Sequence, residues 1–510
     1  MRSSASSATT LKSTTPSMEL FPPSSESWKP HAGQKLGMKF LLEHACAILA
    51  ADPGVGKTSI TYGAFKILLK KKVASKMLVI APLKPCYLVW PKEQEKWTDF
   101  SGLKVVVLHG DTRDVDLIED ADVCVINPDG LDWLLGAKRM KSSNGKVSVT
   151  TDLKRFKSFG FDTLVIDELT RFKHSNSGRF KVLKTALHTF SRRWGLTGSL
   201  VANGLLDLFG QCYVMDMGRT LGQYITHYRM KYFTPSFDGF GWNLREGAEE
   251  EIYERLAPLV LRLAAEDYVD MPQVVDVIRE FELPPKVREL YDRLEEDLIA
   301  RIDDKVVVAS TAAVASTKCR QVANGGIYLD QEVIELLDQR EIKKSKREWL
   351  NLHTEKVDLL ADLVEELQGA PLLVAYDFEH DLDRLKTKFG SDIPYIGGGV
   401  SAKRFKELEA AWNHGELPIL FGHPQSVAHG LNLQQAGNHV CWHSLTWDFE
   451  LYDQFIRRIR RQGSKAKRVF NHHLIAKGTI DETMLWALRS KDKGQKALYE
   501  ALKKMRSRRK

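Results

Sequence analysis

The chain has 510 residues, of which 43% are hydrophobic and 27% are charged, a composition typical of a globular protein long enough for about two to four domains. No apolar run reaches the 18 or so residues that span a membrane, and the six cysteines are scattered without a Cys-x-x-Cys pair. The sequence therefore predicts neither an integral membrane protein nor a disulfide framework nor a zinc site.

The net charge of +8 is concentrated near the C-terminus. Residues 454–510 hold 18 lysines and arginines against 4 aspartates and glutamates, so the rest of the chain carries a small acidic excess. A basic segment on a nearly neutral body favours a polyanionic partner, above all nucleic acid. For the final stretch, KKMRSRRK, a solvated tail is the simpler interpretation.

Short apolar, β-branched runs alternate with helical patterns in two parts of the chain. The first part contains KMLVIAPL, LKVVVLHG, DVCVINP and DTLVIDEL, and the second contains APLLVAYDF, DIPYIGGG, LPILFGHP, HVCWHSL and KRVFNHHLI. Strands of this kind, separated by helices, are typical of doubly wound parallel sheets. We therefore expect an α/β protein with two such lobes, joined by a charged helical connector.

The expected boundaries of the domains follow from these patterns. Ten of the first 17 residues are Ser or Thr, so the N-terminal segment is predicted to be disordered. The expected order is a disordered tail at 1–27, a first lobe at 28–260, a helical connector at 261–350, a second lobe at 351–490 and a basic tail at 491–510.

The segment AADPGVGKTSITYGAF has the features of a phosphate-binding loop, although Ala51 stands where the usual G-x-x-x-x-G-K-[ST] pattern has its first glycine. Gly54 and Gly56 provide flexible backbone whose N–H groups can point at phosphate oxygens, and the helix that follows favours negative charge at its start. Lys57 supplies a positive charge for the β- and γ-phosphates, and Thr58 supplies a hydroxyl for magnesium.

A second motif supports this interpretation. About 110 residues further on, the apolar run TLVIDEL ends in Asp167 and Glu168. At the carboxyl end of a neighbouring strand, Asp167 is expected to hold magnesium and Glu168 to activate the attacking water. Each motif alone is common, but the two together predict a P-loop NTPase that hydrolyses ATP with Mg²⁺.

The order of motifs along the chain resembles that of superfamily 2 helicases, and most of all their Swi/Snf-type branch. PHAGQKLGMKFL resembles the Q-motif, IAPLKPCYLVWPKEQEKW resembles the motif that contacts the nucleic-acid backbone, and GLTGSLVANGLLDLFGQ resembles motif III. PLLVAYDFEHDLDRL, SVAHGLNLQQAG and QFIRRIRRQG resemble motifs IV, V and VI. The resemblance covers nearly the whole chain after Trp28, and it implies two RecA-like lobes with ATP in the cleft between them.

The same resemblance implies roles for residues outside the phosphate loop. Gln34 of the Q-motif would read adenine, and Thr197 of motif III would couple the nucleotide to the nucleic acid. Lys84, Gly430 and Asn432 would contact nucleic-acid phosphates. Contacts of this kind carry no sequence information, so recognition of DNA is expected to be independent of sequence.

Four arginines in QFIRRIRRQG are candidates for phosphate contacts. Arg458 and Arg461 lie three apart on an expected helix, and hence on one face, so they could form the positive fork that stabilises phosphoryl transfer. Arg457 and Arg460, on a different face, are expected to contact nucleic acid or solvent. Arg457 also stands where a glycine is often found in this motif.

The expected function is that of a DNA helicase or translocase in replication, recombination or repair, in the cytoplasm of a bacterium or a phage-infected cell. An ATP-regulated nucleic-acid clamp that does not travel and an RNA helicase are the alternatives. A metal nuclease is not expected, because His472 and His473 are adjacent on a predicted strand and would point to opposite faces. Trp90 is a candidate for stacking on bases.

Overall fold

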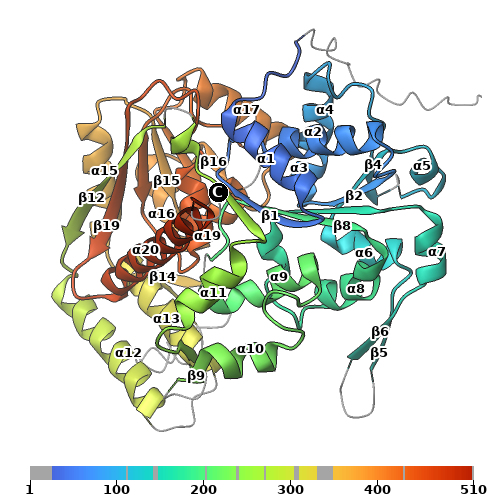
Figure 1. Cartoon of the computed structure of the whole chain (residues 1–510). Helices are drawn as coiled ribbons and strands as arrows, with labels where there is room; N and C mark the ends of the chain where they lie inside the picture. The colour runs from blue at the N-terminus through green and yellow to red at the C-terminus, as the bar shows by residue number, and fades with distance from the viewer. Residues whose placement is uncertain are drawn as a thin grey trace, which may run out of the picture.

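The computed structural model describes residues 26–110, 113–141, 147–201, 204–236, 241–268, 271–303, 309–329, 348–428 and 431–507. These residues form two α/β lobes that lie side by side, each around a parallel sheet (Figure 1). The prediction of two RecA-like, doubly wound lobes is confirmed. Within the described ranges, no helix combines the length and the apolar character needed to cross a bilayer.

The first sheet is parallel throughout. Alternate residues of its central strands enter two apolar cores, one on each face, as Ile48 and Leu49 do. This burial on both faces explains why the strands read as continuous apolar runs. In spatial order the strands are β11 (Val260–Leu263), β1 (Cys46–Ala51), β8 (Arg192–Thr197), β7 (Thr163–Asp167), β2 (Met77–Ile80), β4 (Val123–Ile126) and β3 (Val105–Leu108).

Helices follow the strands of the first lobe and cover both faces of its sheet. A short hairpin, β5 (Lys138–Lys141) with β6 (Val147–Thr150), projects from the body, and a second joins β9 (Phe233–Pro235) to β10 (Trp242–Leu244) (Figure 1). The helices are α1 (Ala32–Glu43), α2 (Lys57–Lys70), α3 (Leu83–Leu88), α4 (Trp90–Lys96), α5 (Asp116–Glu119), α6 (Leu131–Leu134), α7 (Leu153–Ser158), α8 (Gly178–Ala186), α9 (Leu208–Asp216), α10 (Ile225–Tyr232) and α11 (Ala248–Leu256).

The second sheet is also parallel, and the five runs predicted for it are all strands. In spatial order it contains β12 (Gln273–Phe281), β19 (Arg468–Ala476), β18 (His439–Trp442), β15 (Leu372–Ala375), β17 (Ile419–Gly422) and β16 (Tyr395–Ile396). Its helices are α15 (Glu355–Glu366), α16 (Glu379–Phe389), α17 (Ala402–Asn413), α18 (Pro424–Val427), α19 (Phe449–Ile456) and α20 (Ile480–Ser507).

The segment expected as a helical connector differs from that expectation at both ends. β11 completes the first sheet, and β12 pairs in parallel with β19 along its full length as an edge strand of the second. Only the middle is helical, with α12 (Pro285–Asp303) and α13 (Ala309–Asn324), and a small hairpin of β13 (Gly326–Tyr328) and β14 (Trp349–Asn351) follows. β12 was missed because its half-buried and exposed residues alternate, which hides the apolar run typical of the inner strands.

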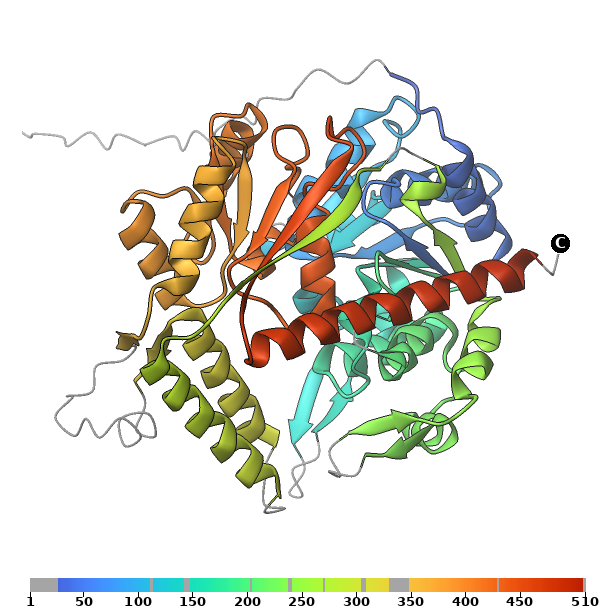
Figure 2. The ribbon, with the colours of Figure 1, turned by 90° about the vertical axis from the view of Figure 1, so that its left-hand side faces the viewer.

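Residues 491–507 of the expected basic tail belong to a helix, and the last three lie outside the described residues. α20 contacts β19 and α19 of the second lobe and β11 and α11 of the first. Figure 2 shows it crossing the face of the molecule from one lobe to the other. Met484 and Leu488 on this helix are buried and Trp486 is exposed, so the helix has one apolar face that packs on the body. The N-terminal tail expected at 1–27 lies almost wholly outside the described residues.

α9 approaches the backbone that follows β7 very closely. A Cβ atom on Gly210 would lie 2.4 Å from the carbonyl oxygens of both Phe172 and Lys173. Phe172 ends a short 3₁₀ turn, Leu169–Phe172, that begins directly after Glu168. Only a residue without a Cβ permits this contact, so Gly210 fixes α9 against the acidic end of β7.

We expect Gly210→Ala to lower the free energy of unfolding by about 1–3 kcal/mol, because the added methyl group forces two packed backbone segments apart. Gly102→Ala is the matched control, since a Cβ at Gly102 meets nothing within 4 Å. Urea denaturation of both variants beside the unmodified protein measures the difference. Equal loss of stability in the two variants would contradict the close contact.

Candidate nucleotide site between the lobes

The phosphate loop lies at the carboxyl end of β1 and leads into α2. Gly54 and Gly56 have φ angles of +90° and +87°, which glycine adopts without strain. The Nζ atom of Lys57 donates to the carbonyl oxygen of Ala51 at 3.0 Å, so the lysine lies across the mouth of the loop. Burial lowers the pKa of Lys57, while the negative charges of Glu168 and Asp167 oppose that shift. The loop therefore holds its lysine next to the carboxylates at the end of β7.

Asp167 and Glu168 end β7 beside the loop. Burial and the charge of Glu168 raise the pKa of Asp167 to about 6, and the indole N–H of Trp90 donates to its Oδ2 at 3.0 Å. Trp90 is fully buried, so the hypothesis that it stacks on bases is wrong. Glu168 has a φ of +56°, a conformation that is costly for a residue with a side chain and that is found most often at functional sites.

The residues around the loop fit a magnesium ion and phosphate groups. The Oε2 atom of Glu168 is buried and has no hydrogen-bond partner, and such atoms in proteins normally serve a ligand or a water molecule. Asp167, Glu168 and the buried hydroxyl of Thr58 are hard oxygen donors, which magnesium prefers. Their assignment to the metal and to the reaction stays a prediction.

Residues 457–461 of the second lobe, called here the arginine segment, lie against the phosphate loop. A Cβ placed on Gly54 would be 3.5 Å from the Cγ and Nε atoms of Arg461. Arg458 is buried and donates to the carbonyl oxygens of Leu431 at 3.1 Å and Ala428 at 2.7 Å. Burial and the charge of Arg461 lower the pKa of Arg458 to about 10.

Two expectations about these arginines were wrong. α19 ends at Ile456, and the arginines follow in turns instead of sharing the face of a helix. Arg457 pairs with Asp52 of the phosphate loop, with 3.0 Å between its Nη1 and Oδ1 of Asp52, and Arg460 donates to the carbonyl oxygen of Pro272 at 2.8 Å and pairs with Glu266. Arg457 and Arg460 are therefore held by protein partners and do not form a face for nucleic acid.

Two further predicted residues lie at the phosphate loop. Gln34 donates from Nε2 to the carbonyl oxygen of Val55 at 3.0 Å, and its Oε1 accepts from the backbone N–H of His31 at 3.1 Å. Thr197 ends β8 beside β1, and its hydroxyl donates to the carbonyl oxygen of Ser199 at 2.7 Å. The adenine-reading and coupling roles of these residues stay predictions.

The residues proposed for nucleic-acid phosphates are only partly placed. Lys84 is half-buried between the lobes, with its Nζ atom 4.1 Å from the ring centre of Phe405 and 3.3 Å from the carbonyl oxygen of Ser426. Asn432 accepts from Arg461 through its Oδ1 atom. Gly430 lies outside the described residues. Lys84 and Asn432 thus contact the opposite lobe and the arginine segment respectively.

Sequence reasoning missed two acidic residues at the site, the buried Asp52 and the partly buried Glu450. Asp52 accepts from Nη2 of Arg262 at 2.5 Å and from the N–H of Ala265 at 2.9 Å. Although burial raises its pKa, the charges of Arg457 and Arg262 hold that pKa below the usual range. Glu450 on α19 accepts from the hydroxyl of Thr170 at 2.9 Å across the cleft. The sequence around Glu450 contains no pattern that would have indicated this role. Asp52 could have been found, because it lies within the phosphate-loop motif.

The chain is similar to one protein family and to several known proteins. Residues 33–337 match the family model described as SNF2-related domain. A putative protein of Acyrthosiphon pisum secondary endosymbiont phage 1 is 31% identical over 94% of this chain and 100% of its own length. A Bacillus subtilis putative ATP-dependent helicase/translocase is 23% identical over 90% of this chain.

Coverage differs among the relatives. The chain spans the whole phage protein but only 47% of the Bacillus subtilis protein. The Sulfolobus solfataricus SWI2/SNF2 ATPase core in complex with dsDNA is 21% identical, with a TM-score of 0.40 over 94% of this chain and 95% of that one.

We expect Glu450→Gln to stabilise the protein in a pH-dependent way. Burial and the charge of Glu168 raise the pKa of Glu450 to about 7, from an ordinary 4.5, although the hydroxyl of Thr170 and the charge of Lys173 act against the shift. Because the folded protein binds this proton more tightly than the unfolded chain does, the native glutamate costs stability as pH rises from about 4.5 to 7. The amide carries no such cost.

The variant should therefore be more stable than the native protein by about 1–3 kcal/mol at pH 8, and the difference should vanish below pH 4.5. Urea denaturation at pH 4, 6 and 8, without nucleotide or magnesium, measures it. Glu254→Gln, at an exposed position of α11, is the control and should show no such trend. A Glu450→Gln variant that is less stable than the native protein at pH 8 would contradict the raised pKa of Glu450.

Proposed function

Because the chain belongs to the SNF2-related family, we propose that it is an ATP-driven motor that travels along duplex DNA without sequence preference. Membership of the family makes it a helicase-like ATPase. The proposal adds the kind of nucleic acid, the movement and the roles of individual residues. One observation carries it: Arg461 of the second lobe lies beside Gly54 in the phosphate loop of the first.

The first lobe would bind the phosphates of ATP. Backbone N–H groups around Gly54 and Gly56 and the ammonium group of Lys57 would hold the β- and γ-phosphates. Thr58 and Asp167 would hold a magnesium ion, whose charge neutralises the phosphate oxygens. The burial that raises the pKa of Asp167 would be offset by such a cation.

Hydrolysis would need both lobes. Glu168 would accept the proton of the attacking water at its buried, unpartnered Oε2 atom. Arg461 would stabilise the negative charge that develops on the transferred phosphoryl group, and Arg458 would anchor the segment that carries it. Loss of the phosphate would weaken the attraction between the lobes, and repeated closure would move the protein along the strand.

Several observations favour DNA as the nucleic acid along which the protein moves. The basic residues near the C-terminus, apart from the arginines held by protein partners, fit a polyanion, and the motif order resembles the Swi/Snf-type branch. A relative from Bacillus subtilis is named as a putative ATP-dependent helicase/translocase. The similar phage protein is consistent with the cytoplasm of a bacterium or phage-infected cell as the place of action. The role proposed for the motor there is in replication, recombination or repair of DNA.

Two other functions are the alternatives to this motor. An ATP-regulated clamp that stays in place has no need of a water-activating carboxylate, which Glu168 supplies. An RNA helicase would use the same nucleotide site and would differ only in the strand that stimulates it. ATP hydrolysis assays distinguish all three.

We expect ATP hydrolysis to be stimulated most by duplex DNA, and less by single-stranded DNA or RNA. Lys57→Ala and Glu168→Gln should each lower the stimulated rate by about 100-fold or more, because each removes a group that acts on the reacting phosphate or water. Lys70→Ala, at an exposed position of the same helix as Lys57, is the control and should keep the native rate.

Movement is tested separately by displacement of a triplex-forming strand from duplex DNA. ATP-dependent displacement by the native protein, absent in Glu168→Gln, supports the motor. Tight DNA binding without hydrolysis would support the clamp and overturn the proposal. If RNA alone stimulated ATP hydrolysis, the nucleic acid on which the protein acts would be RNA instead of DNA.

A further inference from the structure

Arg457 connects the second lobe to the phosphate loop through a buried ion pair. Its Nη1 atom lies 3.0 Å from Oδ1 of Asp52, and its Nε atom donates to Oδ2 of Asp453 at 2.7 Å. The side chains of Arg457 and Asp52 are only 10% and 5% exposed. One planar guanidinium thus joins a carboxylate of the first lobe to a carboxylate of its own lobe.

The charges around this pair are balanced. Asp52 also pairs with Arg262 of β11 and accepts from the N–H of Ala265, while Asp453 is 21% exposed and keeps contact with water. Removal of Arg457 would therefore leave Asp52 with two partners and Asp453 solvated. This matters because breaking a buried pair is severely destabilising only when the remaining charge has no other partner. Arg457 can be changed without loss of the phosphate loop.

The position of Arg457 in the chain ties this pair to Arg461, the residue proposed to act on the transferred phosphoryl group, and to its anchor Arg458. Arg458 and Arg461 follow it directly in the same irregular segment, after the end of α19. Backbone hydrogen bonds hold this segment together locally, as between the N–H of Arg460 and the carbonyl oxygen of Ile456 at 3.0 Å. Its place relative to the phosphate loop depends on side-chain contacts with the first lobe. The pair with Asp52 is one anchor on the first lobe, and the hydrogen bond between Glu450 and Thr170 at 2.9 Å is a second, at the other end of α19.

We propose that Arg457 is a positioning residue that docks the arginine segment on Asp52, so that Arg461 lies at the phosphate loop before any nucleic acid is bound. The proposal rests on the proposed function, since it concerns the same ATPase site. Arg457 touches neither the phosphates nor the attacking water in this role. It acts by holding the two lobes in the arrangement that the reaction uses.

Arg457→Gln removes the charge but keeps a polar side chain of moderate length. Without nucleic acid, its kcat for ATP should fall about 10- to 100-fold, the rate equivalent of one lost charge-assisted hydrogen bond. KM should change little, because the groups proposed to bind the phosphates belong to the first lobe. Duplex DNA bound across both lobes should restore part of the rate. Arg457→Lys should be intermediate, since lysine can reach only one of the two carboxylates.

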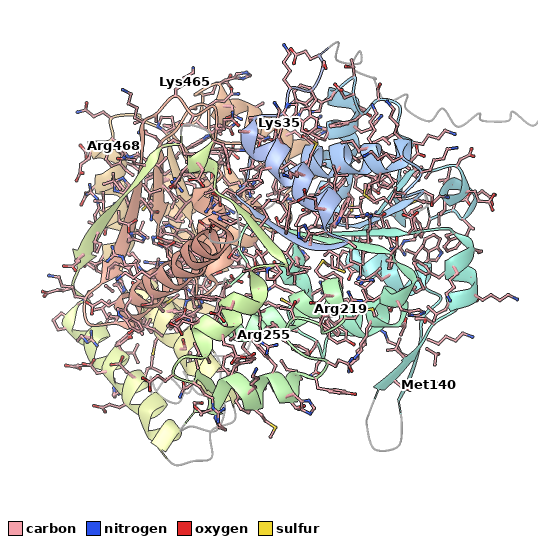
Figure 3. All side chains as sticks on the ribbon, in the orientation of Figure 1. Lys35, Met140, Arg219, Arg255, Lys465 and Arg468 are labelled. Atoms are coloured by element: carbon pink, nitrogen blue, oxygen red, sulfur yellow. The ribbon has the colours of Figure 1, made fainter. Side chains whose placement is uncertain are left out.

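The separation of the lobes is measured independently of catalysis with spin labels on cysteines introduced at Lys35 and Lys465. These exposed residues lie on the first and second lobes respectively (Figure 3). Five of the six native cysteines are buried, and the sixth, Cys46, is replaced by alanine. Pulsed electron–electron double resonance should give a narrow distribution of distances between the labels in the protein with Arg457. In Arg457→Gln the distribution should be broader, with a longer mean distance.

Arg468→Gln is the control, because Arg468 is exposed at the start of β19 on the second lobe (Figure 3). It should leave both kcat and the distance distribution unchanged. A native-like distribution and kcat in Arg457→Gln would overturn the docking role, as would a rise in KM alone with unchanged distances. If the native protein hydrolyses no ATP, the proposed function fails, whereas the distance measurement still decides whether Arg457 docks the lobes.

Discussion

Compensation of buried charge is the constraint on which the cleft between the lobes depends. The first lobe brings Asp52, Asp167 and Glu168 to one edge of its sheet, with Lys57 among them. The second lobe adds Arg457 and Arg458, together with one more acid, Glu450. Neither lobe alone balances these charges, because charged groups removed from water need partners of opposite sign. The arrangement of the two lobes is therefore an electrostatic matter as much as one of packing.

The parallel sheets explain why these groups meet at one place. The strands of a parallel sheet end at the same edge, so residues far apart in the chain, such as Ala51, Asp167 and Thr197, reach the cleft together. Burial of both faces of each sheet in apolar cores leaves the loops at this edge as the place for polar chemistry. The strained backbone of Glu168 is tolerated because β7 and the close contact of α9 hold it on both sides.

Local patterns were enough to predict the inner strands and the phosphate loop, because burial on both faces imposes apolar runs and phosphate binding imposes glycine and lysine. They were not enough for β12, whose polar residues suit an edge position, nor for the partners of the arginines. Thr170 and Glu450 are 280 residues apart, and nothing in either neighbourhood indicates the other. Arg457 was recognisable only as a departure from an expected glycine, and its partner depends on how the lobes meet.

The contact of Gly210 with the backbone after Glu168 has a mechanical consequence. A helix is stiff along its axis, and at Gly210 α9 packs directly on the backbone at the end of the 3₁₀ turn Leu169–Phe172. α9 has nine residues and is roughly 13 Å long at 1.5 Å per residue. α9 thus connects the turn that follows Glu168 with Met217, which is 36% exposed at the surface of the first lobe.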